Sequence, residues 1–331
     1  MKRLAIAILL AAATARAQVV AMSGSDVIVA HDGIVERYDA SMKRVWSVDG
    51  VGHPARIAVG NTSIAVIDSF ANELRLVDLA NGRNRQVSTG ETPIDAIFID
   101  RDLFVLDRDD HRLEKIAGAS VSLAADPAFL RAANGMLYVY SRLDGIVQEI
   151  SPNTMRIAGS VTLAPFASDF ETDGRSGYLV YPQEARLRTF DLATMKRAGD
   201  IAAGVVPVDL AITARANTFS ASRLALADPS AKRVWVVEGE ESVARAVTRG
   251  FLRGLLGLGL FAPASSEFPT GVDRVATRGS ITVAYDSTTR SLYRVKGSKG
   301  TLIAHGVGPN AFAISNGTIL VWQNGALRLI H

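Results

Sequence analysis

The chain has 331 residues, of which 48% are hydrophobic and 21% charged, and its formal net charge at pH 7 is +3. This composition excludes an intrinsically disordered chain, which has few hydrophobic residues and a high net charge. Cysteine is absent, so disulfides, thiolate metal sites and c-type haem attachment motifs are excluded.

The N-terminal residues predict a secretory signal peptide over residues 1–17. Two basic residues precede an apolar run from Leu4 to Ala13, and Ala15-Arg16-Ala17 is a small-x-small cleavage site. The run is shorter than the ~20 residues of a transmembrane helix, and no later segment is long and apolar enough. We expect an exported protein, periplasmic or extracellular, with no transmembrane segment and a single domain over residues 18–331.

Removal of this leader changes the charge balance. The leader contains three basic residues, so Lys plus Arg falls from 36 to 33 and equals the 33 Asp plus Glu. Because the mature chain is then no longer basic, a nucleic-acid partner loses its electrostatic support and is not expected.

One unit repeats along the chain. From Pro54 to Pro93, four short apolar runs are separated by turn residues, and a glycine and a proline close the unit. Prolines recur in this role at positions 54, 93, 127, 165, 207, 269 and 309. Such a period is typical of architectures in which each unit buries its faces against its neighbours. We expect each unit to form a four-stranded antiparallel sheet.

The second and third apolar runs of a unit differ in pattern. Ile64 to Ile67 is apolar on both faces, whereas Glu73 to Leu76 alternates. A strand covered on both sides by neighbouring sheets is apolar throughout, and an outer strand reaches solvent on one side. The pattern predicts an all-β fold, a single β-propeller of four-stranded antiparallel blades. We prefer eight blades, the last one short, and seven is the alternative if the two chain ends merge into one blade.

Two units resemble a known repeat. The segments FDLATMKRAGDIAAGVVP (residues 190–207) and LVDLANGRNRQVSTGETP (residues 76–93) are similar to the YVTN β-propeller repeat, in which an Asp-x-Ala-Thr/Asn turn precedes a strand, a glycine and a proline. NHL repeats have a closely related pattern. The resemblance covers nearly the whole mature chain, but Ile67-Asp68-Ser69 stands where the YVTN family has Val-Thr-Asn. It implies an exported propeller, and propellers that resemble this one include lactonases and the substrate-binding parts of redox enzymes.

The interval from Pro207 to Pro269 is longer than the others, at 62 residues. Residues 243–250 fit either the outer strand of this unit or the start of a basic amphipathic helix. We favour the strand, because Gly250 and Gly254 would each cost a helix about 1 kcal/mol. An apolar insertion between blades then follows, at about residues 251–268.

This insertion contains large apolar side chains that a solvated loop would not keep exposed. They either cover the channel as a plug or small satellite core, or form a patch that contacts a partner protein or a membrane surface. The candidate partner-binding residues are Phe251, Leu252, Leu255, Leu256 and Phe261.

Charged residues occur at or near the start of the first strand in several units. In a propeller, these starts lie at one mouth of the central channel, where ligands bind. We expect the charged residues to converge there and to hold a cation, an ordered water or a polar ligand; the alternative is that each merely starts a strand or caps a turn. The candidate ligand-binding residues are Arg56, Asp95, Asp169, Asp209 and Asp273.

No motif indicates catalysis. The five histidines lack metal-ligand spacing, and neither a G-x-S-x-G elbow nor a Walker loop is present. Asp107 to His111 is rich in oxygen ligands but lacks the EF-hand pattern, which favours a tight polar hairpin over a Ca²⁺ loop. We expect no cofactor and no metal site.

The sequence therefore predicts an exported, non-catalytic scaffold that binds a protein, a glycan or a small ligand at its channel mouth. The alternative is a lactonase-like propeller enzyme with a divalent metal at the same mouth. Enzymatic activity is left open, with a non-enzyme favoured.

Overall fold

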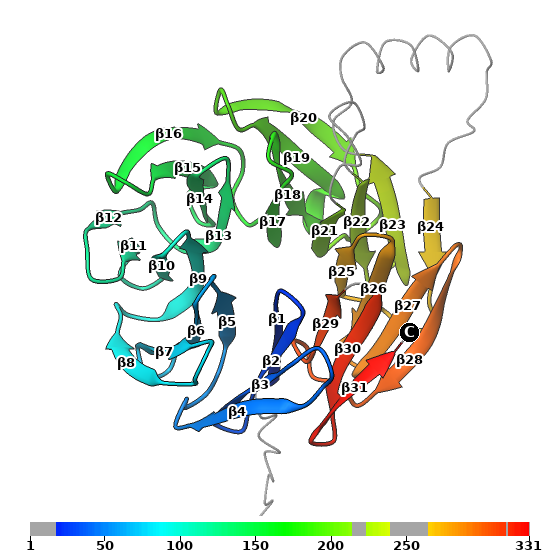
Figure 1. Ribbon diagram of the computed structural model, residues 1–331. Helices are drawn as coiled ribbons and strands as arrows, with labels where there is room; N and C mark the ends of the chain where they lie inside the picture. Colours follow the sequence, from blue (N-terminus) through cyan, green and yellow to red (C-terminus); the bar gives the residue numbers. More distant parts are fainter. Residues whose placement is uncertain (1–17, 214–222, 239–263, 316, 331) are drawn as a thin grey trace, which may run out of the picture.

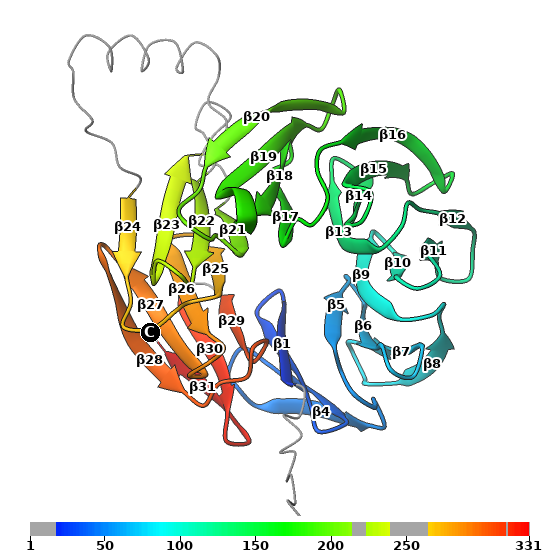
Figure 2. The same ribbon diagram turned by 180° about the vertical axis from the view of Figure 1, so that it is seen from behind.

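A computed structural model describes residues 18–213, 223–238, 264–315 and 317–330. Antiparallel sheets follow one another in a ring around a central opening (Figure 1). The view from behind shows the same opening, with β1, β5, β9, β13, β17, β21, β25 and β29 nearest to it (Figure 2). These eight are called the inner strands.

Five sheets have four strands each. The first two contain β1 (Gln18–Ser23), β2 (Asp26–His31), β3 (Ile34–Tyr38) and β4 (Arg44–Asp49), then β5 (Arg56–Val59), β6 (Ser63–Asp68), β7 (Glu73–Asp78) and β8 (Asn84–Ser88). The third contains β9 (Pro93–Ile99), β10 (Asp102–Asp107), β11 (Arg112–Lys115) and β12 (Ser120–Ser122). The fourth contains β13 (Pro127–Ala133), β14 (Met136–Ser141), β15 (Ile146–Ser151) and β16 (Arg156–Thr162). The fifth contains β17 (Asp169–Thr172), β18 (Ser176–Tyr181), β19 (Arg186–Asp191) and β20 (Lys196–Ala202), with a 3-10 turn η1 (Pro182–Glu184).

The remaining strands form an eight-stranded and a three-stranded sheet. The larger sheet is two antiparallel sets of four, joined by one parallel pair between Glu267 and Lys299. Its first set contains β21 (Asp209–Thr213), β22 (Arg223–Asp228), β23 (Arg233–Glu238) and β24 (Ala264–Glu267). Its second contains β25 (Arg274–Arg278), β26 (Ile281–Asp286), β27 (Ser291–Lys296) and β28 (Lys299–His305). The last sheet contains β29 (Phe312–Ser315), β30 (Thr318–Gln323) and β31 (Ala326–Ile330).

The expected all-β architecture of repeated four-stranded antiparallel sheets is confirmed. The first and last sheets remain separate, and an isolated parallel bridge between Val19 and Asn310 joins them. The preference for eight blades over seven stays a prediction.

Burial follows the predicted strand patterns. Every residue of β18 is buried, whereas the burial of β7 is interrupted along the strand and β8 is mostly exposed. Each second strand is covered by two neighbouring sheets, so its apolar run is buried on both faces.

The hydrophobic core lies between sheets. Separate clusters join each sheet or four-strand set to the next along the chain, for example Ile67 of β6 with Val105 of β10. One cluster joins the two ends of the chain, because Val27 of β2 packs with Tyr285 and Trp322 of β26 and β30. Burying a large apolar side chain contributes about 1.5 to 3 kcal/mol. Only the neighbouring sheet supplies this burial, so packing holds the ring closed.

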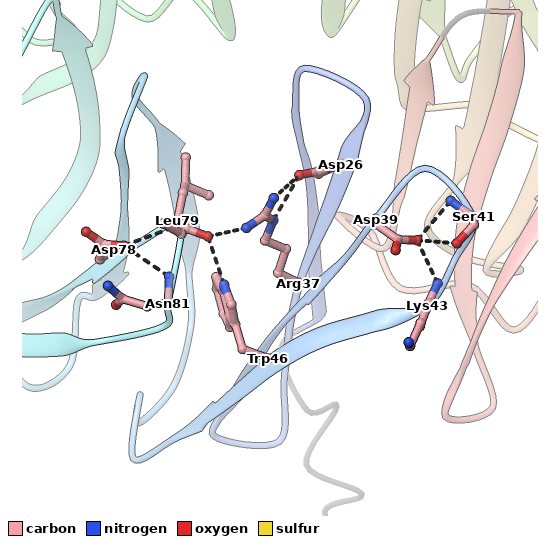
Figure 3. A network of polar contacts seen from close by, with 10 residues as sticks. Asp26, Arg37, Asp39, Ser41, Lys43, Trp46, Asp78, Leu79 and Asn81 are labelled. Carbon is pink, nitrogen blue, oxygen red and sulfur yellow. Dashed lines mark hydrogen bonds and ion pairs between the residues drawn. The ribbon is translucent and has the colours of Figure 1, made fainter.

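Polar contacts also join neighbouring sheets (Figure 3). Arg37 of β3 donates from Nε to Asp26 Oδ2 at 2.9 Å, and from Nη1 to the carbonyl oxygen of Leu79. The same oxygen accepts from Trp46 Nε1 at 2.9 Å. Leu79 follows β7 in the next sheet, so its carbonyl is satisfied by two side chains of the preceding one.

Gly177 marks a close contact in the buried strand β18. A Cβ at this position would lie 2.1 Å from Cε1 of Phe190, which is fully buried. We expect Gly177→Ala to lower the free energy of unfolding by about 2 to 3 kcal/mol, because the ring cannot retreat without overpacking the core. Urea unfolding measures this loss. Equal stability of Gly177→Ala and wild type would contradict the prediction.

The long interval is built differently from the prediction. The outer strand beside β23 is β24, in which Ser265 pairs with Trp235 and Glu267 with Arg233. Residues 243–250 were expected in this position, and that prediction was wrong because Ala264–Glu267 occupies it. The insertion therefore falls within a unit, between its third and fourth strands, and not between blades. Residues 239–263 themselves lie outside the described residues.

Candidate functional site

Four of the five predicted charged residues occupy the same register position in their sheets. Each faces the penultimate residue of the second strand: the pairs are Arg56 with Ile67, Asp95 with Leu106, Asp169 with Val180, and Asp209 with Ala227. Because the inner strands surround the opening (Figure 1), equivalent positions bring these side chains toward one another. Their common end of the ring, where the inner strands begin, is called the mouth face.

Asp273 lies one residue before that position, which Arg274 occupies opposite Tyr285. The Asp273 carboxylate accepts hydrogen bonds from Ser287, through the backbone amide at 3.0 Å and through the hydroxyl. The guanidinium of Arg274 donates to Asn310 Oδ1 at 2.7 Å. Asp273 thus caps the loop that contains Ser287, at the edge of the cluster. This matches the alternative expectation for these residues, in which a charged residue merely starts a strand or caps a turn.

Arg131 is the central cation of the site, and the sequence analysis missed it. Its guanidinium lies 3.6 Å from Asp95 Oδ2, 3.5 Å from Asp169 Oδ1 and 2.8 Å from Glu171 Oε1. Arg56 Nε contacts the other oxygen of Asp95 at 2.7 Å. These residues and Asp209 are called the channel cluster: Arg56, Asp95, Arg131, Asp169, Glu171 and Asp209.

A signal for the two missed residues was present. Arg131 and Glu171 each stand two residues beyond the shared register position, opposite Tyr138 and Tyr178. Side chains two apart in a strand lie on the same face, so a charged residue at this position lies on the same face as the residue at the shared register position, which is Asp169 in β17. A search for charged residues two positions further along each inner strand would therefore have found Arg131 and Glu171.

Burial and mutual repulsion shift the titration of the acids. Burial raises the pKa of Asp169 and of Glu171, although the charge of Arg131 lowers both. Burial raises the pKa of Asp209 well above its usual value, and the nearby charge of Asp169 adds to the rise. Burial alone lowers the pKa of Arg131, but Glu171, Asp169 and Asp95 together raise it above its ordinary value. Arg131 therefore stays charged, and the acid side of the cluster carries unrelieved repulsion.

Two of the carboxylates also hold neighbouring inner strands together. Asp169 Oδ2 accepts from the Leu210 amide of β21 at 2.9 Å, and Asp209 Oδ2 accepts from the Val275 amide of β25 at 2.7 Å. Each acid therefore links its own inner strand to the next one. The same side chains form the site and help to hold the ring together.

A cavity of about 630 Å³ opens among these residues. Side chains from β5, β13, β17, β21 and β25 line it, including four of the five predicted residues and the two missed ones. Asp95 is absent from the lining because it lies behind Arg56 and Arg131, to which it is paired. The predicted convergence of charge at the channel mouth is therefore present in the geometry, whereas a ligand-binding role stays a prediction.

Buried side chains fix the connections on the mouth face. Asp228 accepts from the amides of Val205 and Val206, at 2.6 Å and 3.1 Å. The hydroxyls of Tyr140 and Tyr181 both donate to the carbonyl oxygen of Ala164 at 2.9 Å. These connections of the mouth face are therefore preorganised, which lowers the entropic cost of binding.

The candidate partner-binding residues lie outside the described residues. The strand before them, β23, ends away from the mouth face, because Glu238 pairs with Arg223, the first residue of β22. Second strands begin at the end of the ring opposite to the mouth face, so β23 ends there. The role of the candidate partner-binding residues stays a prediction.

Within residues 18–213, 223–238, 264–315 and 317–330, no three His, Cys, Asp or Glu side chains are placed to hold a metal ion. The loop from Asp107 to His111 joins β10 and β11 as the predicted hairpin. In the same described part of the chain, no helix has the length and apolar character needed to cross a membrane.

Comparison with known proteins identifies the fold of the chain but not its family or its function. No protein-family model matches the sequence, and no curated protein matches it. Among solved structures, BamB from Moraxella catarrhalis is similar with a TM-score of 0.64 and 13% identity, over 94% of this chain and 92% of that chain. Hydrazine synthase from Kuenenia stuttgartiensis is similar with a TM-score of 0.60 and 14% identity, over 84% of this chain and 95% of that chain.

A β-propeller domain from Myceliophthora thermophila Cps50 (Swd1) is similar with a TM-score of 0.58 and 13% identity, over 83% of this chain and 94% of that chain. The chain therefore has a β-propeller fold. The finer resemblance to YVTN or NHL repeats stays a prediction.

Proposed function

We propose that the protein is an exported, non-catalytic scaffold of YVTN or NHL type that binds a partner protein at its mouth face. The observation that carries this proposal is the cavity of about 630 Å³, into which five inner strands direct charged side chains. Concave sites with a few converging polar groups are the usual binding sites of proteins, and preorganised walls favour binding. Export is supported by the leader at residues 1–17.

The lactonase-like alternative requires a divalent metal at the channel mouth. In the described part of the chain, arginines instead pair with Asp95 and Asp169 there. Scaffold binding is therefore the function that this geometry supports best.

Site-specific photo-crosslinking in intact cells tests the proposal. A photoreactive phenylalanine replaces Phe166, which is 59% exposed on the mouth face, or Val45, which is 46% exposed on the outer strand β4. We expect a discrete protein adduct from position 166 and none from position 45, because only the first position lies in a loop of the mouth face. An adduct from position 45 alone, or from neither position, would contradict the proposal.

A further inference from the structure

Large exposed apolar side chains occur in four separate loops of the mouth face. Phe70 lies between β6 and β7, Leu143 between β14 and β15, Phe166 before β17 and Val205 before β21. All four are more than half exposed, and Phe70 is 87% exposed. The other large exposed apolar residues within the described ranges lie on the outer strands β4, β16, β28 and β31. We call these four loop residues the apolar mouth residues.

Phe166 is held in place by its surroundings despite its exposure. Its backbone has a φ of 64°, a left-handed conformation that non-glycine residues rarely adopt. The Phe166 amide donates to the Arg142 carbonyl at 3.0 Å, and the next amide, Ala167, donates to Tyr140 Oη at 3.0 Å. An aromatic side chain on a fixed backbone is an efficient anchor, since little conformational entropy is lost on binding.

The cavity enclosed by this face has an excess of acids. Asp169, Glu171, Asp209 and Asp273 line it together with only three arginines. Two of those arginines, at positions 56 and 131, are also paired with Asp95. The cavity therefore complements a positive charge.

Asp209 is the acid whose charge is least compensated. One of its oxygens accepts the Val275 amide, and within the described part of the chain no Lys, Arg or His lies within 4 Å of the carboxylate. The charge of the Arg274 guanidinium lowers the pKa of Asp209, but this guanidinium is hydrogen-bonded to Asn310. A cationic group at this carboxylate would relieve the repulsion from Asp169.

We propose that the mouth face binds a protein segment that inserts a lysine or arginine side chain into the cavity against Asp209, while flanking apolar residues pack on Phe166 and Val205. This inference rests on the proposed scaffold function and adds the chemistry of the partner. A small cation would satisfy Asp209 but would leave the apolar mouth residues exposed. An anionic partner would meet the excess of acids, and like charges in contact oppose binding.

Selection from a random twelve-residue peptide display library on the immobilised exported chain tests the proposal. We expect enriched peptides to contain a lysine or arginine flanked by apolar residues. A selected peptide is then titrated against wild type, Asp209→Asn and Phe166→Ala by isothermal calorimetry. The amide side chain of the Asp209→Asn variant would retain an oxygen for the Val275 amide, so the fold should be unchanged, and thermal unfolding of each variant verifies this.

The expected result is a Kd raised about tenfold or more by Asp209→Asn and by Phe166→Ala, and by norleucine in place of the basic residue of the peptide. The control variants Asp102→Asn, at the opposite end of the ring, and Val45→Ser, on β4, should leave Kd unchanged. Enriched peptides that lack a basic residue, or that bind Asp209→Asn as tightly as wild type, would overturn the inference. If such peptides are still weakened by Phe166→Ala, the scaffold function stands; if no peptide depends on either residue, both fail.

Discussion

Replacing Arg131 with alanine is expected to lower the free energy of unfolding by about 3 to 5 kcal/mol at pH 7. The guanidinium is the shared partner of Asp95, Asp169 and Glu171, and two of these acids, Asp95 and Asp169, are buried. Its loss leaves buried carboxylates without a counter-charge, which costs more than the original pair contributed. Guanidinium chloride unfolding at pH 7 measures the change.

A matched control comes from the same sheet. Arg142 forms an ion pair with Asp126 at 2.8 Å, but its side chain is 42% exposed. Arg142→Ala should therefore cost no more than about 1 kcal/mol. The loss in Arg131→Ala should also shrink toward pH 4, because burial raises the pKa of Asp169 and Glu171 and both acids take up protons more readily once the arginine is absent. If Arg131→Ala and Arg142→Ala are equally stable, Arg131 does not hold the cluster together.

The stability of the protein is expected to fall as pH rises from about 4 to about 7, with Asp107 as a main cause. Burial, and then the charge of Glu114, raise the pKa of Asp107 to about 7 from the ordinary 3.8. Its Oδ1 has no hydrogen-bond partner, and Oδ2 lies 3.4 Å from Arg112 Nη2, which Glu114 and Asp110 also contact.

The sign follows from the two pKa values. Below about pH 4, Asp107 is protonated in both the folded and the unfolded chain, and it does not oppose folding. Between about pH 4 and pH 7 the unfolded chain loses this proton first, so the free energy of unfolding declines. By pH 8 the cost is on the order of 4 kcal/mol, at about 1.36 kcal/mol per pKa unit for a rise from 3.8 to about 7.

Asp107→Asn should therefore be more stable than wild type at pH 8 and nearly equal to it at pH 4. Chemical unfolding at a series of pH values measures this, and the difference between the two proteins isolates Asp107 from other titrating groups. The control is Asp68→Asn, at the equivalent position of β6, where the carboxylate accepts the amides of Phe70, Ala71 and His53. Asp68→Asn should be destabilised; an Asp107→Asn variant less stable than wild type at pH 8 would show that its ionised form is favourable.

The regular units were predictable because their signals are local. The apolar run of β6 and the interrupted burial of β7 depend on which faces neighbouring sheets cover, and the same constraint recurs in every unit. The outer strand β24 was missed for a related reason. Its four residues, Ala264–Glu267, carry no strong strand pattern, and only their pairing with β23 assigns them.

The cluster at the channel mouth could be predicted in part. The positions of Arg56, Asp95, Asp169 and Asp209 could be inferred, because each follows a proline that closes the preceding unit. Asp273 satisfied the same local criterion, yet a shift of one residue places Arg274 at the register position. A register shift of one residue moves a side chain to the other face of a strand, and sequence position alone does not resolve such a shift.

The sequence by itself determined the repeat, the strand patterns within each unit and the tendency of acids to occur at the starts of inner strands, and it predicts a leader at residues 1–17. Tertiary structure alone decided that Arg131 lies between Asp95 and Asp169, that Asp209 has no cationic partner in the described chain, and that four apolar side chains are exposed in loops of the mouth face. The physical reason is that local patterns report which face of a strand is covered. Distances between residues in different units depend on how the sheets pack around the ring, and that packing sets the charge balance of the cavity.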